Sequence, residues 1–483
     1  MTESGIDATI NAWMRPIADG LSSVVFFELP LGDDRGVPLV VLWLVAGAVY
    51  CTLRFDFINV RGFSHGVRLV FHTAPDHHPG EVSHFQALST AISGTVGIGN
   101  IAGVAVAISM GGPGAALWMA IAGLLGMSTK FVECSLGVIY RRENPDGSVS
   151  GGPMYYLERG FAERGWARVG RGLGVFYAVG IVIGCLGIGN MFQSNQAFTQ
   201  LVSVTGGEYS WLADKGWLVG IVIALLVGVV IIGGIRSIAR VASRLVPFMA
   251  VLYLVGATAV IAMNFEALPW AFSAMVEGAF TNQAMGGGAV GALIVGFQRA
   301  VFSNEAGIGS ATIAHSAVRT REPLSEGFVS LLEPFIDTVV ICQATALVVI
   351  TTSYFDPTLS DGLGGIEMTS AAFEKRISWS PYALALAAIL FALSTMVAWS
   401  YYGLKGWTYL VGESRPAEIA FQALFCIFVA LGCTLQLGAI LDFSDALVFL
   451  ICIPNLIGIY VLSPVVRARL AAYDRTAGAN NGS

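Results

Sequence analysis

The chain has 483 residues, of which 55% are hydrophobic and 12% are charged, and its formal net charge at pH 7 is −6. Soluble domains carry about 25% charged residues. This composition, with a mean hydropathy of +0.71, therefore excludes a soluble enzyme, a disordered chain and a nucleic-acid-binding protein. The seven cysteines lie in or beside apolar segments, which argues against a disulfide framework or a metal cluster. We expect an all-α integral membrane protein.

The N-terminal region is not expected to be a cleavable signal, because acidic residues outnumber basic ones in residues 1–37. Residues 6–27 mix apolar and polar positions and predict a short helix lying at the membrane interface. A helix that crosses a bilayer needs about 20 mostly apolar residues. This criterion predicts eleven spans, at residues 38–54, 84–109, 113–138, 172–203, 216–235, 239–263, 287–316, 327–352, 381–403, 417–436 and 442–466.

The basic residues indicate the orientation of these spans. Lys and Arg are enriched on the cytoplasmic side of membrane proteins. If residues 1–37 are outside, 19 of the 26 basic residues fall inside, 5 fall outside and 2 lie within spans. We therefore predict a multi-pass protein of the plasma or cell inner membrane, with its N-terminus outside and its C-terminus in the cytoplasm.

Two spans contain residues that weaken a helix near the middle of the membrane. The second span includes Ser93–Asn100 and the seventh includes Phe302–Gly309, and both runs are rich in Gly. Each Gly costs about 1 kcal/mol relative to Ala inside a helix. An unwound turn at this depth is tolerated only where it lines a wet cavity, and its free carbonyls and N–H groups can bind a cation and a carboxylate. The alternative is that these glycines only let helices pack closely.

The second and seventh spans stand five apart and begin two halves of five helices each. The halves are residues 84–263 and 287–466, preceded by an outside N-terminus, an additional helix and a cytosolic loop in residues 1–83. Residues 467–483 form a cytosolic tail. An odd number of spans per half predicts that the halves are inverted relative to each other.

Nine motifs follow one another along the chain from about residue 84. They are Gly97–Ala105, Gly111–Ala115, Gly126–Glu133, Gly151–Tyr156, Gly189–Asn195, Phe302–Gly307, Phe335–Thr338, Ser394–Met396 and Trp399–Gly403. With these motifs the chain resembles the alanine/glycine:cation symporter family, although it has Ile98 where Thr is expected and Leu332-Glu333-Pro334 where a Gly-containing stretch is expected. The resemblance implies the leucine-transporter-like fold, a 5+5 inverted repeat behind one additional N-terminal helix.

The resemblance also implies a sodium ion between the second and ninth spans. Its ligands would be the carbonyls of Ser93 and Val96 and the hydroxyls of Ser394 and Thr395. Neutral oxygens suit a hard cation. The alternative is that the two hydroxyls bond back to carbonyls one turn earlier in their own helix.

The implied substrate is a small neutral amino acid whose carboxylate meets N–H groups of the second span and whose ammonium meets carbonyls of residues 302–305. Gln193 would complete the polar shell, unless it makes only a packing bond between helices. Phe302 and Trp399 would restrict the pocket to alanine or glycine, unless they serve only in packing. The implied substrate-binding residues are Thr95, Gly97, Ile98, Gly99, Gln193, Phe302 and Trp399.

Several ionisable residues also fall in or beside the spans. Lys130 and Glu133 are expected to pair within one helix near the inner boundary, and Glu305 is expected to hold or gate the unwound seventh span. Glu333 and Asp337 lie four apart on one helical face. A wet cytosolic loop explains the cluster of His65, His72, His77, His78 and His84 better than a metal site does.

The sequence thus predicts a sodium-coupled symporter that imports alanine or glycine by alternating access. Its partners would be the amino acid, sodium and the lipid bilayer, with no nucleic acid and no obligate protein partner. A proton-coupled carrier is the main alternative, but the predicted ion ligands do not titrate near neutrality. A gated channel is less well matched, because a site between two internal repeats favours alternating access. An enzyme is not expected.

Overall fold

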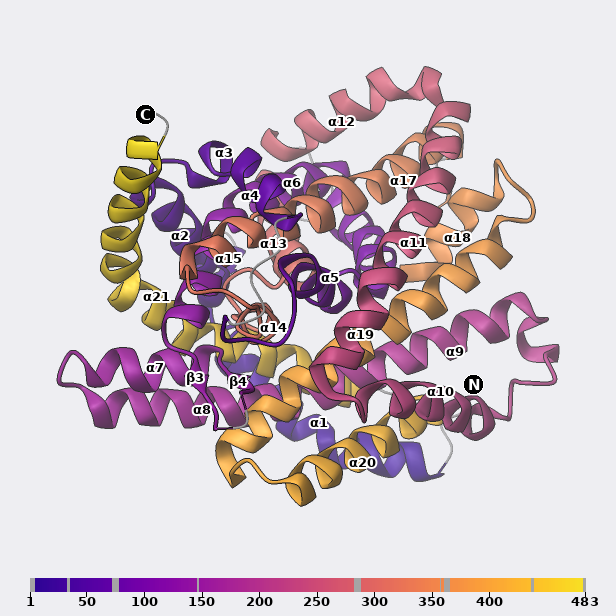
Figure 1. Ribbon diagram of the computed structural model, residues 1–483. Helices are drawn as coiled ribbons and strands as arrows, with labels where there is room; N and C mark the ends of the chain where they lie inside the picture. The colour runs from indigo at the N-terminus through magenta and orange to yellow at the C-terminus, as the bar shows by residue number, and fades with distance from the viewer. Residues whose placement is uncertain are drawn as a thin grey trace.

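The computed structural model describes residues 5–32, 35–71, 78–145, 147–281, 288–356, 358–359, 365–435 and 438–480. These residues are almost entirely helical (Figure 1). The strands in the described ranges form two short antiparallel hairpins, β1 (Glu28–Gly32) with β2 (Arg35–Pro38) and β3 (Arg142–Glu143) with β4 (Val149–Ser150).

The first part of the chain forms α1 to α12. The helices are α1 (Gly5–Val25), α2 (Leu39–Arg54), α3 (Ile58–Arg61), α4 (Phe63–Val70), α5 (His84–Thr95), η1 (Ile98–Asn100), α6 (Ala102–Ile139), α7 (Pro153–Ala162), α8 (Ala167–Leu186), η2 (Gly187–Met191), α9 (Phe192–Val204), η3 (Gly207–Tyr209), α10 (Gly216–Ile231), α11 (Gly234–Met263), η4 (Phe265–Ala267) and α12 (Leu268–Phe280).

The second part of the chain forms α13 to α21. The helices are α13 (Gly288–Asn304), α14 (Ala311–His315), α15 (Pro323–Ser330), α16 (Leu332–Pro334), η5 (Phe335–Cys342), α17 (Gln343–Phe355), α18 (Gly365–Glu374), α19 (Ser380–Val411), α20 (Arg415–Gly432) and α21 (Gly438–Asn480).

These helices fall where the sequence places its apolar segments. Seven helical stretches of the described residues are long and apolar enough to cross a membrane, and α2 and α10 are shorter apolar helices. Several apolar side chains point outward, among them Leu225 and Val229 of α10 and Val251 and Val255 of α11. Apolar surface of this extent suits lipid rather than water. The count of eleven spans and the inverted repeat remain predictions.

The second and third expected spans share one long helix, α6, which bends at Gly112. This residue has φ +66°, a conformation that L side chains rarely adopt. The following residue is Pro113, which cannot donate a backbone hydrogen bond to the preceding turn. The chain therefore changes direction at the Gly-Gly-Pro motif without a separate loop.

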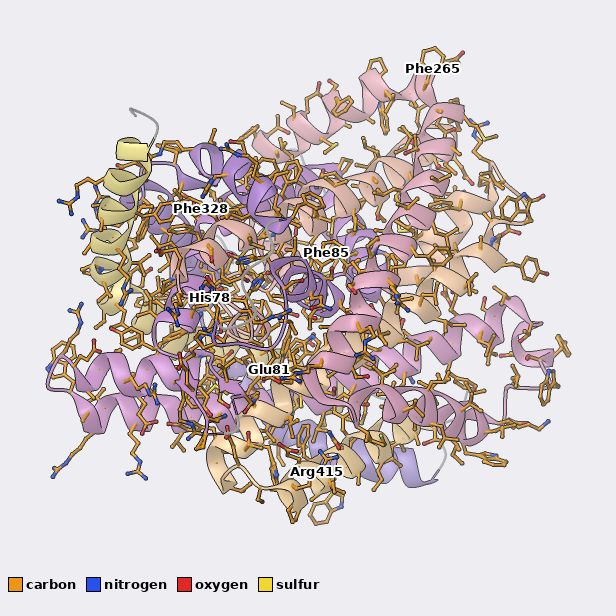
Figure 2. The ribbon with its side chains drawn as sticks, in the orientation of Figure 1. His78, Glu81, Phe85, Phe265, Phe328 and Arg415 are labelled. Carbon is orange, nitrogen blue, oxygen red and sulfur yellow. The ribbon has the colours of Figure 1, made fainter. Side chains whose placement is uncertain are left out.

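Two short helices, α5 and α14, lie near the centre of the molecule and are surrounded by longer helices (Figure 1). α5 begins with a capping box, in which the Ser83 side chain accepts from the Gln86 N–H and the Gln86 side chain accepts from the Ser83 N–H. Phe85, in its first turn, is labelled in Figure 2, as is Phe328 on the neighbouring α15. Both α5 and α14 contact α19.

Candidate functional site

The first helix interruption lies between α5 and α6. α5 ends at Thr95, Gly97 is extended, and the single turn η1 leads into α6. The Gly97 N–H donates to Asn100 Oδ1 at 3.0 Å, and the Ile98 N–H points to Gln193 Oε1 at 3.5 Å. Side-chain oxygens therefore occupy the N–H groups that the interrupted helix leaves free.

The second interruption lies between α13 and α14. Glu305, Gly307 and Gly309 all have positive φ, of +56°, +93° and +86°. Only Glu305 of these three carries a side chain, and its carboxylate accepts a hydrogen bond from the Ser310 hydroxyl. A non-Gly residue in this conformation costs roughly 1–3 kcal/mol, so the surrounding contacts must hold it in place.

Glu133 of α6 and Asn455 of α21 support this second interruption. Glu133 Oε1 accepts from the Gly307 N–H at 3.0 Å and from Asn455 Nδ2 at 2.6 Å, and Asn455 Nδ2 also donates to the Gly307 carbonyl at 2.8 Å. The Tyr177 hydroxyl of α8 donates to the Ile308 carbonyl at 3.0 Å. The unwound segment is thus held by side chains from three other helices.

The two interruptions are joined through Asp337 of η5. Its Oδ1 accepts from Asn100 Nδ2 at 2.6 Å, and its Oδ2 accepts from the Ser303 hydroxyl at 2.6 Å and from the Thr338 hydroxyl at 2.7 Å. Asn304 Nδ2 donates to the Thr338 hydroxyl at 2.9 Å. A buried carboxylate is tolerated when it is fully hydrogen-bonded, and here its donors come from both broken helices.

The predicted sodium ligands lie along the seam between α5 and α19. The Ser93 hydroxyl donates to the Ser394 carbonyl at 2.7 Å. The Ser394 hydroxyl donates to the Phe391 carbonyl of its own helix at 2.9 Å and reaches the Ser93 carbonyl at 3.4 Å. Ser394 therefore makes the bond within its own helix that was the alternative to ion binding, as well as a contact across the seam.

Thr395 differs from its neighbour. Its hydroxyl is buried and has no hydrogen-bond partner among the described residues. A Cβ built on Gly97 would lie 2.7 Å from Thr395 Oγ1, so this hydroxyl points at the turn that Val96 and Gly97 form. An orphaned hydroxyl beside an unwound turn is the feature expected of a group that awaits a ligand.

Two of the predicted substrate residues, Gln193 and Thr95, lie at the first interruption. Gln193 lies against the first interruption, since its Oε1 would stand 3.4 Å from a Cβ on Gly97, and its Nε2 donates to the Ile188 carbonyl at 3.2 Å. Thr95 in that turn has only long contacts of 3.4 Å to carbonyls of its own helix. Gln193 and Thr395 thus approach Gly97 from α9 and α19.

Phe302 and Trp399 contact different parts of the site. Trp399 is buried, donates from Nε1 to the Gly94 carbonyl at 3.2 Å, and packs so closely on Gly189 that a Cβ there would lie 2.3 Å from its ring. Phe302 faces a cavity of about 170 Å³ that also reaches Gly99.

A second cavity, of about 360 Å³, shares Phe302, Arg299 and Asp445 with the first and extends to Asp19 and Asp442. Arg299 consequently lies near the carboxylate of Asp445, which comes from α21. Charged side chains therefore line both cavities beside Phe302.

Several charged residues have partners other than the expected ones. Lys130 donates to Glu333 Oε1 at 2.9 Å, so the expected pair of Lys130 with Glu133 is wrong. His84 is buried and bonds Glu326, so it does not belong to a wet loop. His72 and His77 lie outside the described residues. These partners are distant in sequence, which is why spacing along one helix did not identify them.

Sequence reasoning also missed Asn100, Asn455 and Asp445. Asn100 directly follows the Gly run, and Asn455 and Asp445 are polar residues in an apolar span. Polar side chains at such depth are costly unless they have a role, so this signal was available.

Known proteins resemble the chain along most of its length. The model of the sodium:alanine symporter family matches residues 34–482. The sodium/alanine symporter AgcS of Methanococcus maripaludis is 38% identical over 443 residues, which cover 90% of this chain and 94% of that protein. The probable sodium/glutamine symporter GlnT of Bacillus subtilis is 33% identical over 439 residues, covering 90% and 88%.

Among solved structures, the crystal structure of MhsT in complex with L-phenylalanine is similar, with a TM-score of 0.57 and 16% sequence identity. The match covers 78% of this chain and 88% of MhsT. At this identity the likeness shows a shared fold.

Proposed function

The chain belongs to the sodium:alanine symporter family, and on that premise we propose that it imports small neutral amino acids, alanine and glycine, together with sodium ions. It is a multi-pass membrane transporter rather than an enzyme. In this proposal the eleven spans, the inverted halves 84–263 and 287–466, and an N-terminus outside the cell support alternating access to one central site.

The observation that carries the proposal is the unpartnered hydroxyl of Thr395. A buried hydroxyl without a partner costs roughly 1–3 kcal/mol. A sodium ion in the seam between α5 and α19 would supply that partner. The ion would be bound by the carbonyls of Ser93 and Val96 and by the hydroxyls of Ser394 and Thr395, all neutral oxygens of the kind that a hard cation takes.

The amino acid would bind on the other side of the same turn. Among the described residues, the Ile98 N–H at the start of η1 has a single acceptor, Gln193 Oε1 at 3.5 Å. A substrate carboxylate would replace that oxygen, because it is a stronger acceptor and the start of a helix carries partial positive charge. Thr95, Gly97 and Gly99 would form the rest of this binding turn.

The aromatic residues would set the size of the substrate. Phe302 lies beside Gly99, within 3.7 Å of where a Cβ on that glycine would stand, and so limits the space there. Trp399 would limit the space indirectly, by holding α5 in place through its hydrogen bond to the Gly94 carbonyl. Alanine or glycine would fit such a site better than a large side chain.

The shared turn would also couple the two ligands. Val96 would contribute to the ion site and Gly97 to the substrate site, so each ligand would favour the backbone geometry that the other needs. Linkage then requires that sodium and amino acid raise each other's affinity by the same factor. A proton-coupled carrier is less well supported, because none of the four ion ligands titrates near neutrality.

Uptake by purified protein in liposomes tests the proposal. Under an inward sodium gradient, labelled alanine should accumulate above its outside concentration, and replacing sodium with choline should abolish this. Uptake that survives in choline but collapses with a protonophore would show a proton-coupled carrier instead. Alanine that only equilibrates would indicate a channel. Unlabelled glycine and glutamine, added as competitors, would define the size limit.

A further inference from the structure

Five buried ionisable side chains form a network that links α5 to α6. It passes through α14, the helix that follows the second interruption, and through α15 and α16. Glu326 of α15 bonds His84 of α5 through Oε1, and it bonds Nδ1 of His315, at the end of α14, through Oε2 at 2.5 Å. His315 Nε2 lies 3.6 Å from Glu333 Oε2, and Glu333 Oε1 accepts from Lys130 at 2.9 Å. All five side chains are at most 3% exposed.

The position of His315 between two carboxylates constrains its protonation. A neutral imidazole donates from one nitrogen only, and the lone pair of the other nitrogen accepts. If His315 were neutral and donated to Glu326, its Nε2 lone pair would face the lone pairs of Glu333. Both of these atoms are buried and lack any other hydrogen-bond partner among the described residues. A second proton on the ring lets His315 donate towards both carboxylates.

The balance of charge favours the same state. Glu326 and Glu333 carry two negative charges, Lys130 beside Glu333 carries one positive charge, and His84 bonds Glu326 through Nδ1 alone. A buried excess charge is costly, and one positive charge on His315 removes it. The groups within electrostatic range of the network include Glu133 and Glu305 near Lys130, Arg141 near Glu326, and Asp337 and the neutral Cys134 and Tyr402 near Glu333. Carboxylates still outnumber cations in this wider set.

Beside the network, backbone hydrogen bonds join the segment before α5 to the segment after α14. The residues before α5 pair with the residues after α14 in a parallel bridge between Val82 and Val318. In this bridge the Arg319 N–H donates to the Val82 carbonyl at 2.8 Å. Glu81 and His78, labelled in Figure 2, lie in the segment that leads into this bridge.

Arg141, just beyond α6, closes the same end of the helices. Its guanidinium donates to the carbonyls of Ser316, Val318, Pro79 and Thr320 at 2.6–2.9 Å. Two sets of contacts therefore hold α5 and α14 together. One is formed by hydrogen bonds of Arg141 to backbone carbonyls, and the other is the network of charged side chains.

We propose that His315 holds a proton between Glu326 and Glu333, and that this proton keeps α5 and α14 docked on α15 in the conformation described here. Losing the proton turns the contact with Glu333 into a repulsion between lone pairs. The docked arrangement is thus favoured when His315 is protonated and is weakened as pH rises through its titration. This proton binds away from the seam between α5 and α19, where sodium is proposed to bind. The proposal therefore does not depend on the transported substrate.

Nitrogen NMR of the full-length protein, labelled with ¹⁵N-histidine in detergent, reads this proton directly. A free imidazole loses its proton at about pH 6.5. At pH 8 we expect one of the six histidines to remain protonated on both nitrogens. That signal should vanish in His315→Gln and in Glu333→Gln. It should persist in His65→Gln, because burial and nearby Arg68 lower the pKa of His65, which pairs with Tyr473 outside the network.

Six neutral histidines at pH 8 in the wild type would overturn the proposal, whether or not any variant folds. So would a doubly protonated signal that survives in His315→Gln. Neither reading requires transport, so the result is separate from the sodium and alanine assays.

Hydrogen exchange tests the docking. At pH 7, amides in residues 80–82 and 317–320 should exchange about tenfold faster in His315→Gln than in wild type, since one charge-assisted hydrogen bond is lost. His65→Gln should leave them unchanged. Equal protection in all three proteins would refute the proposed docking role of the proton.

Discussion

Replacing Thr395 with valine distinguishes between two hypotheses about its hydroxyl, that it binds an ion and that it has no function. The substitution keeps the shape and β-branching of the side chain and removes only the oxygen that points at Gly97. If that oxygen does not bind an ion, the change removes an unsatisfied buried hydroxyl. The protein should then keep its activity and gain up to roughly 1–3 kcal/mol of stability.

If the oxygen binds sodium, the same change removes a charge-assisted contact worth about 1.5–3 kcal/mol. Sodium should then bind roughly 10- to 150-fold more weakly. Because sodium and alanine are linked, the affinity for alanine at a fixed sub-saturating sodium concentration should fall as well. In sodium-free buffer the change still removes an unsatisfied buried hydroxyl, so stability should rise while sodium affinity falls, and a general folding defect cannot produce that combination.

The assay is alanine binding to purified protein, titrated against sodium, with thermal unfolding in sodium-free buffer measured on the same samples. Thr408→Val is the matched control, because Thr408 is a buried residue of the same helix whose hydroxyl bonds the Lys405 carbonyl. A sodium midpoint in Thr395→Val equal to that of the wild type would refute the assignment and weaken that of Ser394.

Three further changes test other parts of the site. Gln193→Leu should raise the KM for alanine about tenfold with less effect on the sodium midpoint, in uptake assays, since it removes a polar group beside the substrate turn; an unchanged KM would limit this residue to packing. Gly189→Ala places a methyl group 2.3 Å from an indole ring and should lower the melting temperature by several degrees, whereas Gly172→Ala, with open space around it, should not. Arg141→Ala should destabilise the protein by about 3 kcal/mol or more in denaturant unfolding, because the buried carbonyls of Ser316, Val318 and Thr320 lose a donor, whereas Arg142→Ala removes contacts of a half-exposed side chain, an ion pair with Glu413 and a hydrogen bond to Asn144, and should cost less; equal losses would refute this reasoning.

The sequence was informative wherever a local pattern decides the structure. Clusters of Gly at 94–99 and 307–309 break their helices because the backbone preference acts within a few residues. Apolar runs located the helices for the same reason. The bend at Gly112 was not foreseen as part of a continuous helix, since the Gly-Gly-Pro motif is equally compatible with a loop.

The sequence was least informative about which side chains meet. Lys130 was expected to pair with Glu133 three residues away, and its partner is Glu333 on another helix. His84 and Glu326 are separated by 242 residues, and neither position alone indicates the other. Such pairs depend on how whole helices pack, so the sequence around each residue carries no local sign of its partner.

The contact between Asn100 and Asp337 has a consequence for how the protein is made. The two residues are 237 positions apart, so at about 5–20 residues per second the ribosome needs roughly 10–50 s to add the second after the first. During that interval the newly inserted α5, η1 and α6 expose the Asn100 amide without the carboxylate that later accepts from it. The nascent first half is therefore an incomplete intermediate in the membrane, and it must be protected by water, lipid head groups or the insertion machinery until η5 arrives.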